Sequence, residues 1–490
     1  MISLICAGGK FLPSGAINSE NTEIFTRERA DFSNVNVIEV REDVPFIIEA
    51  ARRASGEYLL LLLRPVRFLE GFERHFVDAM RRPTPALVYS DFLEGRSLRR
   101  LYDYPGDITE RFPLGHVLGV KKSVLLELGL RSEFKRAYLY DFRLRLEERG
   151  GEIVRVPRAL YEVRGGEMGR GLLASFSYLK YPPDLEREVE KAFKDMLKRR
   201  GAFLSGGVRR VFDVGGEIPI SIIIPVRNRA RFIGRALDSL MRQTFVDFEA
   251  VITDTGSTDG TREIIADYAE KDERIRPIFV EGGTLARALN LCVLNSRGRY
   301  VAQLDSDDEY TPDALEVALD VMERHPDAAL GVSYYEVIDE EGFAIDELDV
   351  VRHLEFDRNN ILRTEGAGAL RIWRRSVLLK LGLFDERNFP DFGEDYDMVL
   401  KAVESHDLVR IHRVLYRYRK HGSSSDITTD EERKINLKTL ARKAAMERRK
   451  LINRAGLISR GLPASPLPRL KIRDQGGCHE QEQGAIRDFR

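Results

Sequence analysis

The densest group of side chains that could do chemistry is Asp305-Ser306-Asp307-Asp308. It directly follows the apolar segment Tyr300 to Leu304, which has the pattern of a buried strand. Several carboxylates leaving one strand end together favour a hard divalent cation, because Mg²⁺ and Mn²⁺ prefer oxygen ligands and are often completed by substrate phosphates. Taken alone, an Asp-x-Asp triplet is equally typical of a solvated turn or a helix cap. The sequence around the triplet is needed to distinguish a cation site from a turn or a helix cap.

A second acidic group, Glu394-Asp395-Tyr396-Asp397, lies further along the chain. A carboxylate can accept the proton of a hydroxyl nucleophile and so act as a general base. The alternative is structural, since acidic residues at this position could also cap the helix that continues through Met398-Val399-Leu400.

The elements that must position these carboxylates alternate between strands and helices. Ser221 to Val226 and Ala250 to Asp254 read as strands, and Arg231 to Arg242 and Thr261 to Glu270 have helical patterns. This alternation predicts an α/β fold with a mainly parallel sheet. Ligands of such sheets bind at the carboxyl ends of the strands, where Asp254 and Asp305 also fall.

In this order, the segments resemble the inverting family 2 glycosyltransferases of the GT-A fold. The resemblance rests on about 200 residues and on these elements: the strand ending at Pro225, the Asp254 to Thr261 loop, Asn290, the Gly298-Arg299-Tyr300 strand before Asp305-Ser306-Asp307, Gly382-Leu383-Phe384-Asp385-Glu386, Glu394-Asp395, and Tyr416 to His421. The resemblance implies metal-assisted transfer of a sugar from a nucleotide-diphosphate-sugar to a hydroxyl acceptor, with inversion.

The resemblance also implies a role for each matching residue. Pro225, Arg227 and Asp254 would frame the nucleotide, with Asp305 and Ser306 on the ribose and diphosphate. Asp305, Asp307 and His421 would hold Mn²⁺ or Mg²⁺, although His421, with Arg417 and Arg419 nearby, could instead contact phosphate. Asp395 would be the general base, and Glu394 would either hold Asp395 or bind the acceptor.

Two positions depart from the family pattern. Thr255 stands where many relatives have a second Asp, and Leu289 stands where many have Arg before the Asn. The change at Thr255 weakens any inference about which nucleotide base the protein recognises. The change at Leu289 removes a diphosphate contact.

The two halves of the chain also resemble each other. Gly56-Glu57-Tyr58 matches Gly298-Arg299-Tyr300, Ser123 to Leu130 matches Ser376 to Leu383, and Val154 to Tyr161 matches Val409 to Tyr416. By these offsets Asp305, Ser306, Asp307 and Asp308 face Leu63, Arg64, Pro65 and Val66, while Glu394 and Asp395 face Tyr138 and Leu139. We therefore expect the first half to be a degenerate, non-catalytic copy.

These matches predict tandem GT-A-like domains joined by a helical linker. The expected divisions are a degenerate domain at 1–164, a helical linker at 165–218 whose helix is capped by Asp184, a catalytic domain at 219–425, a helical extension at 426–460 and a disordered tail at 461–490.

Composition limits the class of protein. Lys and Arg number 78 against 79 Asp and Glu, so no global field favours nucleic acid. Three cysteines, Cys6, Cys292 and Cys478, lack paired spacing and favour a reducing compartment. No apolar run is long enough to span a membrane, so we expect a cytoplasmic protein, with peripheral membrane contact and self-association left open.

The leading hypothesis is a glycosyltransferase of glycan or surface-polysaccharide biosynthesis. A UDP-sugar is the first-choice donor, and a carbohydrate or lipid-linked glycan is the expected acceptor. A catalytically inert carbohydrate-binding or scaffold protein is the alternative, but intact Asp305, Asp307 and Asp395 argue against it. Trp373 could be a sugar-stacking platform or a strand residue, and we expect Cys292 to be a core residue.

Overall fold

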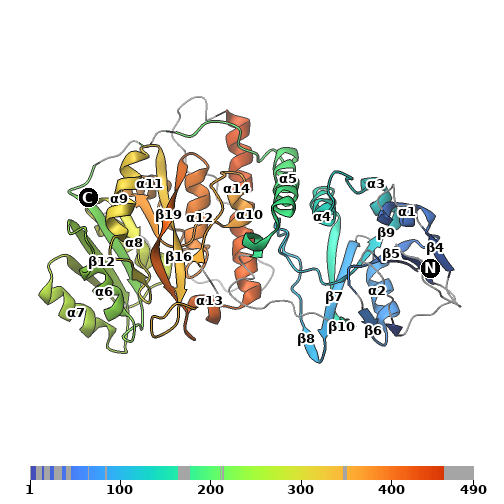
Figure 1. Ribbon diagram of the computed structural model, residues 1–490, viewed down its shortest axis with the longest axis horizontal. Coiled ribbons are helices and arrows are strands. Elements are labelled where there is room, and N and C mark those ends of the chain that lie inside the picture. The colour runs from blue at the N-terminus through green and yellow to red at the C-terminus, as the bar shows by residue number, and fades with distance from the viewer. Residues whose placement is uncertain are drawn as a thin grey trace, which may run out of the picture.

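The computed structural model describes residues 2–6, 14–15, 22–26, 36–39, 46–64, 66–82, 85–163, 177–209, 211, 215–345 and 350–456. Each half of the chain builds one sheet, and helices of the linker and the C-terminal region lie between the two halves (Figure 1). The expected tail at 461–490 and part of the expected linker, 165–176, lie outside the described residues.

The sheet of the second half has the strand order β13-β12-β11-β14-β18-β16-β19-β15, with β17 beside β16. Its strands are β11 (Ile218–Val226), β12 (Phe248–Thr255), β13 (Ile275–Val280), β14 (Gly298–Gln303), β15 (Glu309–Tyr310), β16 (Ala328–Ile338), β17 (Val350–Val351), β18 (Arg371–Arg374) and β19 (Asp407–Arg419). Strands β13, β12, β11 and β14 are parallel neighbours, and β16 and β19 are parallel to each other. The prediction of an α/β fold with a mainly parallel sheet is confirmed.

Helices cover both faces of this sheet (Figure 1). They are α6 (Ile233–Met241), α7 (Thr261–Lys271), α8 (Leu285–Asn295), α9 (Ala314–Arg324), α10 (Ile361–Thr364), α11 (Arg375–Leu381) and α12 (Glu394–Val403). Because successive strand side chains point to opposite faces, Ile222 and Ile224 join one apolar cluster with Leu237 of α6, whereas Ile223 joins another with Leu289 of α8. The strand is therefore apolar on both faces, as a central parallel strand must be.

The sheet of the first half repeats this topology strand for strand. Its strands are β1 (Ile2–Cys6), β2 (Ser14–Gly15), β3 (Thr22–Thr26), β4 (Asn36–Glu39), β5 (Tyr58–Leu62), β6 (Val66–Phe68), β7 (Pro85–Glu94), β8 (Ser97–Arg99), β9 (Val117–Lys121) and β10 (Glu152–Val163). Read from β4, the order is β4-β3-β1-β5-β9-β7-β10-β6, with β8 beside β7 and the additional β2 beside β6. The directions agree as well, since β9 is antiparallel to β5 and β7 just as β18 is antiparallel to β14 and β16.

The helices follow the same correspondence. The first half contains α1 (Phe46–Arg53), α2 (Phe72–Met80), α3 (Lys122–Leu128) and α4 (Tyr138–Glu148). Along the chain they hold the places of α8, α9, α11 and α12 relative to the matching strands. We infer that one fold was duplicated, because strand order, direction and helix placement agree together.

Two helices lie between the sheets, α5 (Pro183–Arg199) and α14 (Glu431–Ala455) (Figure 1). One apolar cluster contains Tyr140 of the first half, Phe193 of α5, Val399 of the second half and Ala445 of α14. A shared apolar core of this kind opposes independent motion of the halves. A short 3₁₀ turn, Ser177–Lys180, precedes α5, and the short α13 (Ser425–Thr428) precedes α14.

The start of α5 differs from the prediction. The N-cap residue is Pro182, and Asp184 lies inside the first turn. Proline is favoured at the first helical position because its fixed φ suits the helix and its missing N–H would have no partner there, so Pro183 sets the helix start. Asp184 instead places a negative charge near the positive end of the helix dipole.

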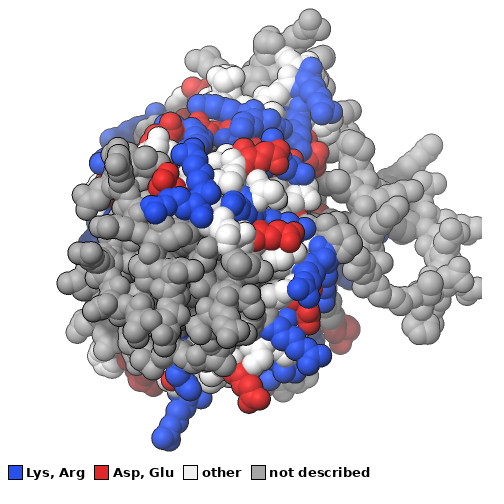
Figure 2. All heavy atoms as spheres, turned by 90° about the vertical axis from the view of Figure 1, so that its right-hand side faces the viewer, with Lys and Arg blue, Asp and Glu red and all other residues white. Residues whose placement is uncertain are grey.

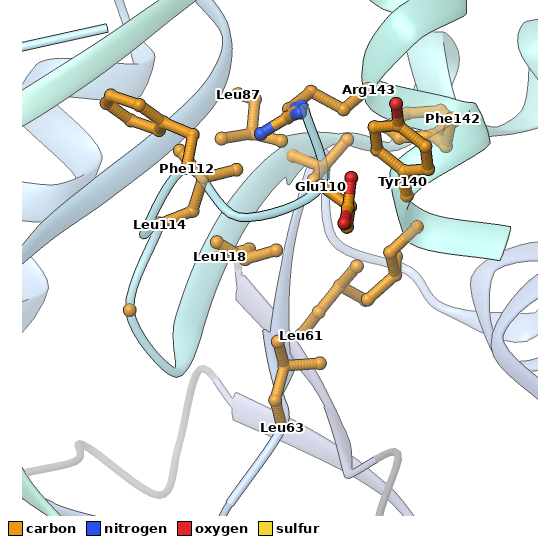
Figure 3. Close-up of a pocket in the computed structure, with 13 residues that line it drawn as sticks. Leu61, Leu63, Leu87, Glu110, Phe112, Leu114, Leu118, Tyr140, Phe142 and Arg143 are labelled. Carbon is orange, nitrogen blue, oxygen red and sulfur yellow. The ribbon is translucent and has the colours of Figure 1, made fainter. Parts of the chain in front are cut away.

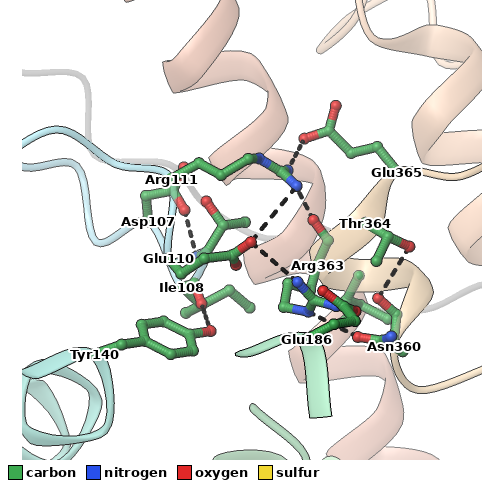
Figure 4. A network of polar contacts seen from close by, with 12 residues as sticks. Asp107, Ile108, Glu110, Arg111, Tyr140, Glu186, Asn360, Arg363, Thr364 and Glu365 are labelled. Atoms are coloured by element: carbon green, nitrogen blue, oxygen red, sulfur yellow. Dashed lines mark hydrogen bonds and ion pairs between the residues drawn. The ribbon is translucent and has the colours of Figure 1, made fainter. Parts of the chain in front are cut away.

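A buried polar network joins the halves beside these helices (Figure 4). The fully buried Arg363 of α10 donates to Glu110 of the first half at 3.0 Å and also pairs with Glu186 of α5. Arg111 donates to the carbonyl oxygen of Arg363 at 2.8 Å and to Glu365 at 3.0 Å. Breaking one partner of a buried ion pair leaves an uncompensated charge, so this network fixes the relative placement of the halves.

The exposed surface carries both signs of charge. Figure 2 shows Lys and Arg interspersed with Asp and Glu over the described part of the face at the end of the first half. Within the residues that the structure describes, no helix has the length and apolar character to cross a membrane.

Candidate active site

The predicted site residues lie on neighbouring elements at the carboxyl ends of strands β11, β12 and β14. Strand register sets Val226 opposite Asp254, so Pro225 and Asp254 lie on adjacent strands next to each other. Asp305 follows the end of β14, and Glu394 and Asp395 open α12. The chain thus brings the two acidic groups to the same edge of the sheet.

Asp254 is 0% exposed and is held as a carboxylate. Its Oδ1 accepts from the backbone N–H of Gly256 at 3.0 Å and from Nε of Arg262 at 2.6 Å. Burial opposes ionisation, but hydrogen bonds from Ser257 and Arg262 lower the pKa of Asp254 below its ordinary value. Its Oδ2 is buried without a partner among the described residues, so one acceptor is available to a ligand.

Gly256 shapes the loop that surrounds Asp254. Its φ of +88° lies in the left-handed region, and a Cβ there would approach the carbonyl oxygen of Glu281 to 2.7 Å. Only glycine adopts this positive φ without strain and lacks the Cβ that would clash with Glu281.

Asp307 lies between two potential cations. Its Oδ2 is 3.1 Å from Nε of Arg229 and 3.0 Å from Nε2 of His421. Although burial raises the pKa of Asp307, the bonds from His421 and Arg229 outweigh it, and the pKa is lowered. His421 is itself buried, with Nδ1 2.9 Å from the hydroxyl of Ser423 and its ring 4.3 Å from that of Phe232.

The pKa values of Asp305 and Asp308 shift in the opposite direction to that of Asp307. Burial and the negative charge of Asp307 raise the pKa of both carboxyls. Asp308 accepts from the hydroxyl of Tyr416 and the backbone N–H of Arg419, both at 2.7 Å, so it anchors the turn to β19. Asp305 accepts from Nε2 of Gln303 at 3.0 Å. The turn therefore concentrates more negative charge than its own partners neutralise.

Arg371 connects this turn to the second acidic group. It is nearly buried in β18, opposite Gln303 of β14, and its NH1 is 2.9 Å from Oδ2 of Asp395. Burial opposes the charge of Arg371, but Asp395 and Asp305 raise its pKa, so it stays a cation between the two carboxylates. Sequence reasoning missed Arg371, although a single cation between Leu370 and Ile372-Trp373 was a usable signal.

Glu394 differs from Asp395 in environment. Burial and the charge of Asp395 raise the pKa of Glu394 well above its ordinary value, which favours a neutral carboxyl group. Its Oε2 is buried and has no partner among the described residues. No hydrogen bond joins Glu394 to Asp395 in the part of the chain that the structure describes; Asp395 is held by Arg371 and by the backbone N–H of Tyr396 at 2.6 Å.

The donor set suits a hard divalent cation. Asp307 Oδ2 and His421 Nε2 are 3.0 Å apart, close to the spacing of roughly 3 Å between adjacent ligands of an octahedral cation. Oε1 of Gln303 is buried and unpartnered within the described ranges, and the carboxylates of the turn are short of positive charge. Within those ranges no three ligand side chains already converge on one point, so Asp305 would have to turn from Gln303 to complete the set.

Other predicted residues have different surroundings. Arg227 is exposed at the end of β11, whereas Pro225 and Ser306 are buried. Arg417 and Arg419, considered as phosphate contacts, pair with Glu309, and Arg417 also pairs with Glu336 at 2.8 Å, so their charges are used within the fold. Trp373 is 0% exposed and belongs to the core, which excludes the stacking role.

Asn290 of α8 holds the Gly382 to Glu386 segment against that helix. Its amide donates to the carbonyl oxygen of Phe384 at 3.0 Å and to Glu386 at 2.8 Å, and its Oδ1 accepts from the N–H of Phe384. The Asn position and the Gly382 to Glu386 segment are thus parts of one structural unit.

The fold and this edge of acidic residues form a candidate active site at the carboxyl ends of parallel strands. Residues 221–382 match the model of glycosyl transferase family 2, so this segment of the second half is a family 2 glycosyltransferase domain.

Curated relatives agree with this assignment. The chain is 28% identical over 285 residues to a hyaluronan synthase of Pasteurella multocida, covering 57% of this chain and 29% of that protein. It is 28% identical over 294 residues to a chondroitin synthase of Escherichia coli, covering 59% of this chain and 42% of that protein. The chain thus spans less than half the length of either relative. Among solved structures, residues 1–349 of S. aureus TarS in complex with UDP align at 20% identity with a TM-score of 0.36, over 45% of this chain and 70% of that fragment.

The first half has lost the charges of this site. The pair Leu61 and Leu118 on β5 and β9 occupies the register that Gln303 and Arg371 occupy on β14 and β18. Leu139, the second residue of α4, stands where Asp395 is the second residue of α12.

Proposed function

We propose that the second half transfers a sugar from a nucleotide-diphosphate-sugar to a hydroxyl acceptor with inversion of configuration. The observation that best supports this is the bridge made by Arg371, which lies between the carboxylates after β14 and Asp395 of α12. The ion pair orients a candidate base beside a candidate diphosphate site, as a single displacement needs.

The donor would bind along the ends of β11, β12 and β14. The unpartnered Oδ2 of Asp254 would accept a hydrogen bond from the nucleotide base or ribose, with Pro225 forming the pocket floor and the exposed Arg227 its rim. Asp305 and Ser306 would face the ribose and diphosphate. A UDP-sugar is the donor to test first.

Mn²⁺ or Mg²⁺ is the proposed cofactor, held by Asp307 and His421 with Asp305. When bound, the cation would neutralise the diphosphate leaving group. Arg229 already contacts Asp307 and would keep that carboxylate ionised and oriented toward its ligand.

Asp395 would act as the general base. The acceptor oxygen forms a bond to the anomeric carbon while the bond from that carbon to the diphosphate oxygen breaks, and the leaving diphosphate takes the electron pair. The acceptor proton passes to Asp395, which Arg371 holds at 2.9 Å. A neutral Glu394 could donate a hydrogen bond to the acceptor, since its raised pKa favours the protonated form.

We infer a role in polysaccharide biosynthesis, with a carbohydrate or lipid-linked glycan as acceptor, because the relatives named above are polysaccharide synthases. We place the reaction in the cytoplasm or at the inner face of the membrane. The first half, without counterparts of Asp305, Arg371 and Asp395, would support the second half rather than catalyse.

The test measures release of nucleoside diphosphate from UDP-, GDP- and dTDP-sugars with Mn²⁺ or Mg²⁺. We expect turnover that requires the metal, disappears in Asp307→Ala and falls at least a hundredfold in Asp395→Asn. Asp320→Asn, a change on the outer face of α9 where Asp320 is 49% exposed, is the matched control and should retain full activity. Absence of turnover together with absence of metal-dependent nucleotide binding would overturn the proposal.

A further inference from the structure

The first half contains a cavity at the position that corresponds to the active site of the second. Its volume is about 190 Å³, and Leu61, Leu63, Leu118 and Leu139 contribute to its lining together with Glu110 and Arg143 (Figure 3). The duplication has therefore kept a hollow here while changing the side chains that surround it.

At each of four lining positions, the first half has a leucine where the second half has a polar or charged residue. Leu61, Leu118 and Leu139 stand where the second half has Gln303, Arg371 and Asp395, and Leu63 stands where it has Asp305. A sugar or diphosphate would leave its polar groups unpaired against leucines, which costs free energy for each lost hydrogen bond. The larger part of the lining therefore suits a hydrocarbon group.

The cavity size limits that group. An apolar cavity of roughly 150 Å³ can hold a benzene molecule, so about 190 Å³ suits one ring or a short alkyl chain. A helix or strand of a partner protein would be too large to enter.

Two polar side chains, Glu110 and Arg143, lie among apolar and aromatic ones in the cavity lining and have spare hydrogen-bonding capacity. Glu110 Oε2 and Arg143 Nε are both buried and have no partner among the described residues. Figure 3 shows the two side chains on one side of the cavity, with Leu61, Leu63 and Leu118 below them. Carboxylate oxygen is an acceptor and guanidinium Nε–H is a donor, so the two groups match the two hydrogen-bonding functions of a hydroxyl group, which both donates and accepts.

These two polar groups are fixed in place by other contacts. Glu110 Oε1 accepts from NH1 of the buried Arg363 at 3.0 Å. Arg143 is 3% exposed and donates through NH2 to the carbonyl oxygen of Thr109. Both remaining atoms are therefore preorganised for a ligand rather than free to turn toward solvent.

We propose that this cavity binds a small alcohol, with its hydrocarbon group against the leucines and its hydroxyl between Glu110 and Arg143. The site is separate from the proposed sugar transfer. It adjoins the contact between the halves because Glu110 also belongs to the network around Arg363 (Figure 4).

The test is isothermal titration of the full chain with 1-butanol, 1-pentanol and 1-hexanol, and with hexanoate. We expect the Kd to fall roughly three- to fourfold with each added methylene, as burial of about 0.8 kcal/mol per CH₂ requires. Hexanoate should bind at least tenfold more weakly than 1-hexanol, because its carboxylate would meet Glu110.

Substitutions in the cavity lining test whether 1-hexanol binds in this cavity. Leu139→Trp enlarges a half-buried side chain of the cavity lining and should abolish 1-hexanol binding, whereas Leu98→Trp, at a side chain 44% exposed on β8, should not. Leu63→Phe provides the same test by a smaller change should Leu139→Trp fail to fold. Equal 1-hexanol affinity in the filled and control variants, or no binding to the wild type, would overturn the proposal. Metal-dependent nucleoside diphosphate release, measured on the same samples, reports separately on the proposed transfer.

Discussion

Arg371 NH1 and Asp395 Oδ2 are 2.9 Å apart, although the two residues come from an antiparallel strand and from the first turn of a later helix. Arg371 also faces Gln303, so its charge lies between the Asp305 turn and the proposed base. The ion pair orients Asp395, whose side chain is 33% exposed, by contact with the nearly buried Arg371.

We predict that Arg371→Lys lowers kcat of sugar transfer roughly a hundredfold, because lysine keeps the charge but loses the rigid guanidinium group whose NH1 contacts Asp395. Donor affinity should change much less than kcat. Steady-state kinetics with the identified donor check this, and Arg324→Lys, at an arginine 72% exposed, is the control. An unchanged kcat would show that Asp395 does not depend on Arg371.

His421→Gln should raise the Mn²⁺ concentration for half-maximal activity at least tenfold, because it removes a nitrogen ligand next to Asp307. Metal titrations of diphosphate release measure the effect, and saturating metal should restore much of the rate. His325→Gln, at a side chain on the protein surface, is the matched control. The same metal dependence in both variants would contradict a role for His421 as ligand.

Asp254→Asn should weaken donor binding by about tenfold while leaving kcat nearly unchanged. The change removes the charge that pairs with Arg262 at 2.6 Å and alters the acceptor facing the nucleotide. A tenfold loss of affinity corresponds to about 1.4 kcal/mol of binding free energy. Because this interaction would be equally strong in the ground state and the transition state, its loss should leave kcat unchanged. Nucleotide affinity measured by calorimetry checks it, with Asp267→Asn on the exposed side of α7 as control.

The contact between the halves should depend on pH through Glu365. Burial favours its neutral form, but Lys438, Arg442 and Arg111 lower the pKa of Glu365 from 4.5 to about 2. The folded pKa is below the unfolded one, so the stabilisation is complete above about pH 4.5 and is lost as pH falls toward 2.

Glu365→Gln should therefore lower the free energy of unfolding by about 3 kcal/mol at pH 7, since each pKa unit corresponds to about 1.4 kcal/mol. The difference from the wild type should shrink as pH falls from 4.5 to 2. Urea unfolding across this pH range measures both quantities, and Glu323→Gln, at a residue 46% exposed, is the control. A difference that stays constant with pH would contradict the assigned charge interaction.

Part of this protein was determined by local sequence. The apolar runs before Pro225 and Asp305 specify buried strands whatever surrounds them, because only strands buried on both faces are apolar throughout. Parallel strands end at one edge, so the sequence predicted Asp254 and Asp305 at the same edge of the sheet, where β12 and β14 lie on either side of β11. The matching blocks of the halves likewise predicted sheets with a common strand order, which the structure contains.

The charge partners were decided only by tertiary structure. Arg371 precedes Asp395 by many residues, and although its apolar neighbours in sequence mark it as buried, nothing local shows that it pairs with Asp395 while Arg417 and Arg419 pair with Glu309. Which cation faces which carboxylate depends on how β18, β19 and α12 pack, and the energy of a pair depends on distance and burial. Tertiary structure also decided the burial of Trp373, whose side chain in β18 lies in the core. It likewise decided the cavity of the first half, where leucines line the position that polar or charged residues hold in the second half.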